Sequence, residues 1–235
     1  YQWVTIPLAM HGVIVKQNGE MINVCVGENE GDPVFCVTDL LPHLGAKQNE
    51  RKLSDGIRGE ELNIVISSLP FVDESEEEGV KDAVKLNALA ILNEMYGITE
   101  RDFLRAEIEF VPATKAQDVG FDRSLIGAYG QDDKVCAYTA LTAEIDTKAP
   151  YYTTVTVLAD KEEIGSYGNT GLSSDFVLHY IEDLAAAQKA NIRKVLRNTT
   201  ALSSDVNGAY DPSFASVYEE RNSCFVNKGP VLTKY

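Results

Sequence analysis

One transition from strand to turn restricts the fold of this chain more than any other feature. An apolar run over residues 153–159 is followed by Asp160, by the adjacent pair Glu162 and Glu163, and by a glycine-rich turn that extends to Gly171. A short apolar run bounded by turn signals predicts a buried strand, and helical periodicity follows the turn. Adjacent strand side chains point to opposite faces, so the two glutamates can share a site only where the chain leaves extended geometry. The order predicts an α/β layer with a largely covered sheet and carboxylates at the end of one strand.

The glycine-rich turn could instead be a phosphate-binding loop, and the glutamate pair could be a plain surface feature. Backbone N–H groups at such turns can cradle phosphate, but the turn lacks the Gly-Lys-Ser/Thr ending of a nucleotide-binding loop. No G-x-G-x-x-G motif follows the strand either. A glutamate pair taken alone is usually a solvated surface feature, whereas paired carboxylates behind a tight turn can face one crevice.

Two further acidic clusters could contribute carboxylates to the same site as the glutamate pair. They are Gln131-Asp132-Asp133 and Ser203-Ser204-Asp205. A hydrolytic centre with two metal ions needs carboxylates to hold and bridge the ions, imidazoles to complete each shell, and a free carboxylate to deprotonate water. Each aspartate also has a structural alternative, because Asp132 or Asp133 could cap the helix expected over 133–145, and Asp205 could end a strand.

The first half of the chain is expected to be rich in strands, with one helix. Asn18-Gly19 predicts a hairpin, and apolar residues at helical spacing from Val80 to Met95 predict a helix that Gly97 ends. The acidic run 73–78 precedes this helix and is expected to stabilise its dipole rather than to bind a metal. We place a domain boundary between residues 110 and 111. The expected strands cover residues 5–15, 21–26, 62–70 and 105–111.

Charge and cysteine content narrow the expected partners and compartment. Acidic residues outnumber basic residues by 36 to 21, which gives a formal net charge of -15. This field repels phosphate backbones and anionic headgroups, so neither nucleic acid nor a membrane is an expected partner. No apolar run approaches the ~20 residues of a membrane span, and no secretory signal opens the sequence. Cys25, Cys36, Cys136 and Cys224 form no C-x-x-C pair, which predicts reduced, buried thiols in a cytoplasmic protein.

Several of these segments occur together in the order of a known family. The chain resembles the aspartyl aminopeptidase family of dinuclear zinc exopeptidases, in particular its bacterial branch, over nearly its whole length. The resemblance implies an α/β/α zinc-exopeptidase catalytic domain, here 111–235, preceded by a strand-rich dimerisation domain, here 1–110. The matching segments are residues 38–44, 120–130, 131–138, 160–166, 201–205 and 228–231.

The resemblance assigns roles to the acidic residues one by one. It makes Asp132 the carboxylate that bridges two zinc ions, Glu163 a ligand of one ion, and Asp205 a ligand of the other. Glu162 becomes the general base that deprotonates water. A bridging carboxylate suits this chemistry, because its two oxygens can span ions about 3.5–4 Å apart.

Two basic residues gain roles from the same resemblance. In the family, the histidine of an Ile-Pro-x-x-Ala-x-His stretch, which matches His11, reaches into the partner subunit's site and stabilises an oxyanion. Lys228, in the Lys-Gly-Pro segment, would line the substrate pocket, although a surface lysine is the ordinary alternative. His43 and His179 are expected to be core or surface residues.

The chain also departs from the family pattern. The family draws metal-ligating histidines from an early His-x-Asp motif and from near the carboxyl terminus, but no His-x-Asp is present and no histidine follows His179. We therefore expect a central fragment that lacks both ends, and the fragment alone is expected to be inactive.

The function implied for the parent protein is that of a cytoplasmic, homo-oligomeric zinc aminopeptidase acting on peptides. Two alternatives remain open from the sequence. One is a scaffold or assembly protein that keeps the fold without the chemistry, which the missing histidines would fit. The other is a related two-metal deacylase or carboxypeptidase.

Overall fold

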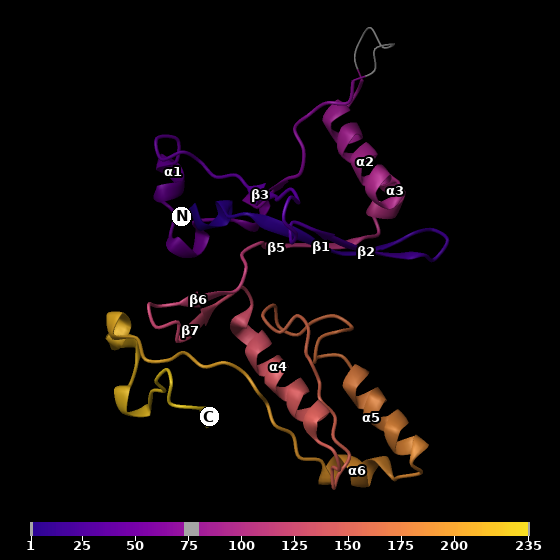
Figure 1. Ribbon diagram of the computed structural model, residues 1–235, viewed down its shortest axis with the longest axis vertical. Helices are drawn as coiled ribbons and strands as arrows, with labels where there is room; N and C mark the ends of the chain where they lie inside the picture. Colours follow the sequence, from indigo (N-terminus) through magenta and orange to yellow (C-terminus); the bar gives the residue numbers. More distant parts are fainter. Residues whose placement is uncertain (1, 73–79, 235) are drawn as a thin grey trace. The chain divides into compact units, whose positions relative to one another are not determined.

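The computed structural model describes residues 2–72 and 80–234. It divides the chain into two compact units, Tyr1–Tyr129 and Gly130–Tyr235 (Figure 1). Unit 1 contains the seven strands of the described chain, and unit 2 contains three of its α-helices. The fold class is therefore mixed α/β, with a strand-rich first part, as predicted. The acidic run 73–78 lies outside the described residues.

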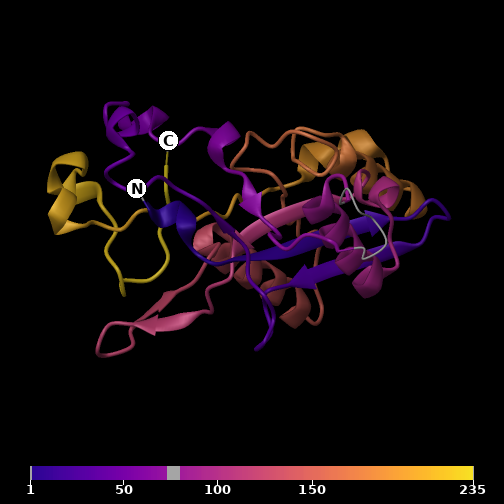
Figure 2. The ribbon, with the colours of Figure 1, turned by 90° about the horizontal axis from the view of Figure 1, so that it is seen from above.

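A three-stranded antiparallel sheet is the centre of unit 1. Strand β1 (Leu8–Val15) lies between β2 (Met21–Val26) and β5 (Glu107–Pro112), as Figure 2 shows. The turn between β1 and β2 is closed by two backbone hydrogen bonds of 2.9 Å between Lys16 and its turn neighbours, with Gly19 at φ +85°. The hairpin predicted from Asn-Gly is confirmed. The expected strand from residue 5 begins only at Leu8, because the chain before it forms the 3-10 helix η1 (Gln2–Thr5).

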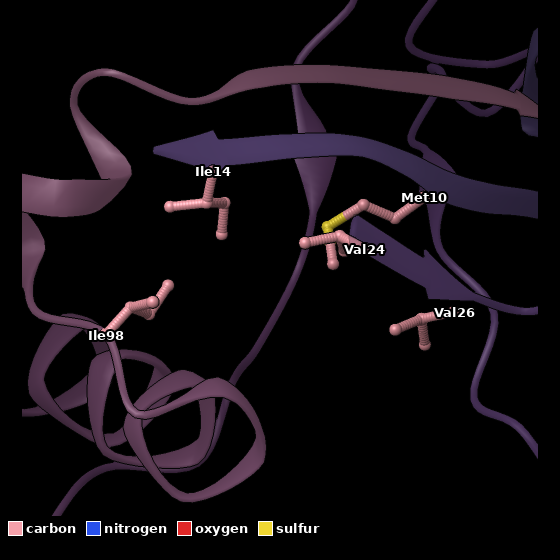
Figure 3. Packing of buried hydrophobic residues seen from close by; sticks show 5 residues of the cluster. All are labelled: Met10, Ile14, Val24, Val26 and Ile98. Atoms are coloured by element: carbon pink, nitrogen blue, oxygen red, sulfur yellow. The ribbon is translucent and has the colours of Figure 1, made fainter. Parts of the chain in front are cut away.

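Helix α2 (Ala83–Tyr96) and the short α3 (Glu100–Phe103) lie over one face of this sheet (Figure 1). Gly97 ends α2 in a left-handed conformation, φ +62°, and its N–H donates to the Asn93 carbonyl at 2.7 Å. Ile98 follows at once, and its side chain and that of Ile14 point toward one another (Figure 3). The helix and its glycine end are confirmed. The buried cluster consists of Met10, Ile14, Val24, Val26 and Ile98.

Small elements complete unit 1. Strands β3 (Cys36–Val37) and β4 (Ile64–Val65) pair, so the expected strand 62–70 is only two residues long. Strands β6 (Gln117–Val119) and β7 (Leu125–Gly127) form a second hairpin. The short helices are α1 (Ala46–Asn49), η2 (Leu53–Asp55) and η3 (Gly59–Glu61).

Unit 2 is helical and loop-rich. Helix α4 (Gln131–Asp146) confirms the helix expected over 133–145. The helical periodicity expected after the glycine-rich turn is present as two helices separated at residues 188–191. The elements are α5 (Phe176–Ala187), α6 (Ile192–Asn198), η4 (Pro212–Val217) and η5 (Glu220–Asn222).

The predicted strand over 153–159, and with it the covered sheet of the second half, is wrong. Within residues 130–234 the structure contains no strand, and Val155, Val157 and Leu158 are 40%, 43% and 52% exposed. A strand exists only through ladder hydrogen bonds to a neighbour, and the described part of unit 2 supplies none. The segment is instead tied to α4, since Thr154 and Thr156 donate to the Glu144 carboxylate at 2.5 and 3.2 Å.

Burial is uneven along the chain. Of the described hydrophobic residues that are buried, only Ala185 belongs to unit 2. The cysteines are unpaired, as predicted, but the expectation of buried thiols is wrong, because Cys25 is exposed and the other three are half-buried. Among the described residues, no helix combines the length and the apolar character that a membrane crossing requires.

Candidate metal centre

The beginning of α4 presents two aspartates outside regular helical geometry. Gly130 is the N-cap residue, with φ +73° and no side chain to cap the helix. Asp132 (φ -87°, ψ 108°) and Asp133 (φ -116°, ψ 28°) follow in non-helical conformations, joined by a cis peptide bond. The two aspartates interrupt the span between this glycine and the regular helix that begins after Asp133.

Three carboxylates from two segments converge at this point. One oxygen from each of Asp132, Asp133 and Asp205 lies within 4.8 Å of the others. The structure thus brings together two of the predicted metal ligands, Asp132 and Asp205. Asp133 joins them; it belongs to the acidic cluster named from the sequence, but the resemblance gave it no ligand role.

The cluster has an unsatisfied acceptor. Oδ1 of Asp133 is buried and has no hydrogen-bond partner among the described residues. Burial of an unpaired carboxylate oxygen is costly, and each pair of like charges at this separation adds about 1 kcal/mol of repulsion even at the dielectric constant of water. A divalent cation would remove both costs. The donor set therefore fits a metal ion, and carboxylate oxygens are ligands for zinc as well as for calcium and magnesium.

A thiol borders the carboxylates. Cys136 lies one helical turn after Asp133 and forms hydrogen bonds with Asp133 and with Ser204, the neighbour of Asp205. Burial, followed by the hydrogen bond to Asp133, raises the pKa of the Cys136 thiol. The thiol therefore stays protonated and donates to the carboxylate beside it. Sequence reasoning missed this contact, although Cys136 follows Asp133 by only three residues.

The predicted tight turn at the acidic pair is present. The N–H of Gly165 donates to the Glu162 carbonyl at 2.9 Å, and Ser166 N–H donates to the Lys161 carbonyl at 2.8 Å. Lys161 at φ +58° and Gly165 at φ +99° make the reversal possible. The side chains of Glu162 and Glu163 are exposed and lie outside the three-carboxylate group. Their roles as base and ligand stay predictions.

The two basic site residues lie elsewhere. His11 is in β1 of unit 1, where its Nε2 lies 2.9 Å from Oε1 of Glu28. Lys228 is exposed in a turn between Asn227 (φ +62°) and Gly229 (φ +96°). The roles of His11 in a partner's site and of Lys228 in a substrate pocket stay predictions. His43 and His179 are exposed, which agrees with the surface alternative.

The mixed α/β fold and the three converging carboxylates define a candidate metal centre, and comparison with known proteins gives the family. The profile of the aminopeptidase I zinc metalloprotease family (M18) matches residues 1–235. The chain belongs to this family, which confirms the resemblance seen in its sequence.

Individual relatives and solved structures match nearly the whole length of this chain. A probable M18 family aminopeptidase 1 of Clostridium acetobutylicum is 50% identical over 100% of this chain and 50% of its own length. The crystal structure of an M18 aminopeptidase from Thermotoga maritima matches with a TM-score of 0.86 and 44% identity, over 97% of this chain and 50% of that one. A more distant structure, described as an S. cerevisiae dodecamer, is 22% identical with a TM-score of 0.66, over 97% and 50%. The chain spans about half the length of the curated relatives it matches.

Proposed function

We propose that the gene product containing this chain is a zinc-dependent aminopeptidase that hydrolyses N-terminal residues from peptides. The observation that carries the proposal is the convergence of Asp132 and Asp205 in a chain of the M18 family. A bound pair of zinc ions would polarise the peptide carbonyl and lower the pKa of a water molecule. The chain's own carboxylates would hold these ions, with further donors completing each shell.

The residues of the chain divide the remaining work. Asp132 would bridge the two ions, while Asp205 and Glu163 would each ligate one of them. Glu162, which is exposed and has no ligand role, would take a proton from water and return it to the leaving amine. The tight turn at Lys161 and Gly165 supports this division, because it frees adjacent glutamates from the opposite orientations of a regular strand.

The proposal includes a homo-oligomer. His11 would stabilise the oxyanion in the site of a second copy, so the smallest active species is a dimer, and a larger closed assembly is consistent with that requirement. Lys228 would line the substrate pocket and pair with an acidic side chain or with the peptide carbonyl. The net charge of -15 supports a peptide rather than a nucleic acid as substrate.

The test measures release of chromophore from aminoacyl-anilides by the metal-free gene product as zinc is added. We expect activity to rise with zinc and to be lost in Glu162→Gln, while zinc binding by that variant persists. A protein that hydrolyses nothing at any zinc concentration would be a scaffold. Full activity on substrates with a blocked amine would indicate a deacylase or a carboxypeptidase.

A further inference from the structure

Residues 224–233, which we call the lysine loop because they include Lys228, begin in contact with another segment of unit 2. The N–H of Tyr210 donates to the Cys224 carbonyl at 2.8 Å. The rings of Tyr210 and Phe225 also contact one another, with their centroids 5.4 Å apart. Tyr210 therefore holds the beginning of the lysine loop through one backbone hydrogen bond and one aromatic contact.

The end of the lysine loop is attached to the same segment, three residues before Tyr210. Nδ2 of Asn207 donates to Oγ1 of Thr233 at 2.9 Å. Oδ1 of Asn207 lies 3.8 Å from Sγ of Cys224, and this sulfur lies 3.3 Å from the Gly208 carbonyl oxygen. A single S–H group can donate to only one oxygen at a time, and the carbonyl oxygen is the nearer. The amide of Asn207 thus lies between the two ends of the loop.

The segment that closes the lysine loop also carries a carboxylate of the candidate metal centre. Asp205 precedes Asn207 by two residues, and its side chain meets the two aspartates of α4. Oδ1 of Asp205 accepts the N–H of Val206 at 2.7 Å, so the orientation of the carboxylate depends on the backbone here. The backbone that orients this carboxylate is continuous with the backbone that holds the lysine loop.

Lys228 depends on such a closure for its position. It is exposed in a turn formed by two left-handed residues, Asn227 and Gly229. The ammonium group of a lysine is carried on a flexible stem of four carbons, so its place is defined only if the backbone beneath it is fixed. A loop that is closed at both ends loses less conformational freedom when it binds a ligand.

From these contacts we propose that Asn207 is the positioning residue of Lys228: its amide closes the lysine loop on the segment of Asp205 and thereby fixes the backbone that presents the ammonium group to substrate. The inference rests on the proposed function, which gives Lys228 its place in the substrate pocket. Asn207 acts through Lys228 and does not touch the substrate. Loss of its amide should therefore weaken substrate binding and leave the chemical step unchanged.

The kinetic test is a double-substitution cycle on the zinc-loaded gene product with aminoacyl-anilide substrates. Asn207→Ala should raise KM about threefold to tenfold, the effect of one neutral hydrogen bond, and should leave kcat within about twofold. In a Lys228→Ala background the same substitution should have no further effect. Thr233→Val removes the other partner of the hydrogen bond and should raise KM equally. Thr233→Ser keeps the hydroxyl group and should preserve KM.

The matched control is Asn222→Ala. Asn222 is exposed at the end of η5 and lies outside the contacts that close the lysine loop, so its loss should leave KM within about twofold. Equal increases of KM in Asn222→Ala and Asn207→Ala, or a full additional increase in the Lys228→Ala background, would overturn the proposal. A lower kcat with weaker zinc binding in Asn207→Ala would also overturn it, because Asn207 would then act through Asp205.

Hydrogen exchange separates this inference from the proposed function, because it requires no turnover. The N–H of Tyr210 reports the closure, since it donates to the Cys224 carbonyl. Its exchange should be about threefold to tenfold faster in Asn207→Ala, while the amides of α4 keep their rates. Unchanged exchange, or faster exchange with an unchanged KM, would refute the positioning role in an active peptidase. Faster exchange in a protein that hydrolyses nothing would retain the closure and refute the function.

Discussion

Asp132 and Asp205 come from different segments of unit 2, yet they present carboxylate oxygens within 4.8 Å of one another, together with Asp133. Like charges gather in this way only at a cost that a bound cation removes. The arrangement makes the metal dependence of the chain testable without any substrate.

Asp132→Asn and Asp205→Asn should each weaken zinc binding by about tenfold or more, because each removes a charged oxygen donor from the shell. Isothermal titration of the metal-free protein with zinc measures the effect. Asp146→Asn, at the opposite end of α4, is the matched control and should bind like the unchanged chain. Equal affinities in all four proteins would show that the cluster holds no metal.

Asp133→Asn should separate repulsion from ligation. Without metal, the variant should be as stable as the unchanged chain or slightly more stable, because one of three neighbouring charges is gone. Zinc at about 100 times its Kd stabilises a single site by about 2.7 kcal/mol, and the variant should lose part of that gain. Thermal unfolding with and without zinc gives both values. If Asp133→Asn is less stable than the unchanged chain without metal, and zinc stabilises both proteins equally, a ligand role for Asp133 is contradicted.

Mixing two inactive proteins should restore activity if His11 acts in the site of a partner. His11→Ala supplies an intact Glu162, and Glu162→Gln supplies an intact His11, so a hybrid dimer contains one complete site. After random subunit exchange, about a quarter of the normal activity is expected from two-fold pairing. Each variant exchanged only with itself is the control. Absence of recovery after exchange, verified by mass spectrometry, would place His11 outside the partner's site.

The ion pair of Arg51 and Glu61 should make the stability of the chain depend on pH in the acid range. Two hydrogen bonds of 2.8 Å join the Arg51 guanidinium to the Glu61 carboxylate. Hydrogen bonding to Arg51 is the largest cause that lowers the pKa of Glu61 from 4.5 to about 2. Because the pKa of Glu61 is lower in the folded chain than in the unfolded chain, the ion pair stabilises the fold at pH values above the unfolded pKa of 4.5. This contribution is lost as the pH falls through the folded pKa of about 2.

Urea unfolding from pH 7 to pH 2 tests the expectation. The midpoint difference between the unchanged chain and Glu61→Gln should be constant above about pH 5 and should shrink between 4.5 and 2. Glu60→Gln, at the neighbouring exposed position, is the control and should give no such pH dependence. A difference that grows as the pH falls would contradict the sign.

Truncating a buried side chain should lower the stability of unit 1 far more than truncating an exposed one. Ile98→Ala removes a side chain that is 2% exposed and packs in the cluster with Ile14, so a loss of about 2–5 kcal/mol is expected. Ile91→Ala, on α2 and 45% exposed, should cost much less. Urea denaturation measures both, and equal losses would show that the cluster does not control the stability of unit 1.

Local signals in the sequence predicted the structure where local chemistry decides it. The Asn18-Gly19 hairpin and the glycine that ends α2 depend on backbone preferences a few residues long, and both are present. The strand expected over 153–159 is absent, because an apolar run becomes a strand only where a neighbouring strand supplies hydrogen bonds. The residues themselves carry no record of that neighbour.

The candidate site was predictable in part. Asp132 and Asp205 were named through the resemblance to the family, and the structure brings them together. Asp133 was part of the acidic cluster named from the sequence but received no ligand role, and an aspartate beside a helix start has a plain capping explanation. The contact between His11 and Glu28 was not anticipated, since it depends on how β1 and the loop after β2 meet.

The uneven burial of the two units affects how the chemistry can change by mutation. The carboxylate cluster belongs to unit 2, whose described residues include a single buried hydrophobic side chain, Ala185. Replacing a site residue there disturbs few buried neighbours within unit 2, so substitutions at the carboxylate cluster should cost the packing of this unit little.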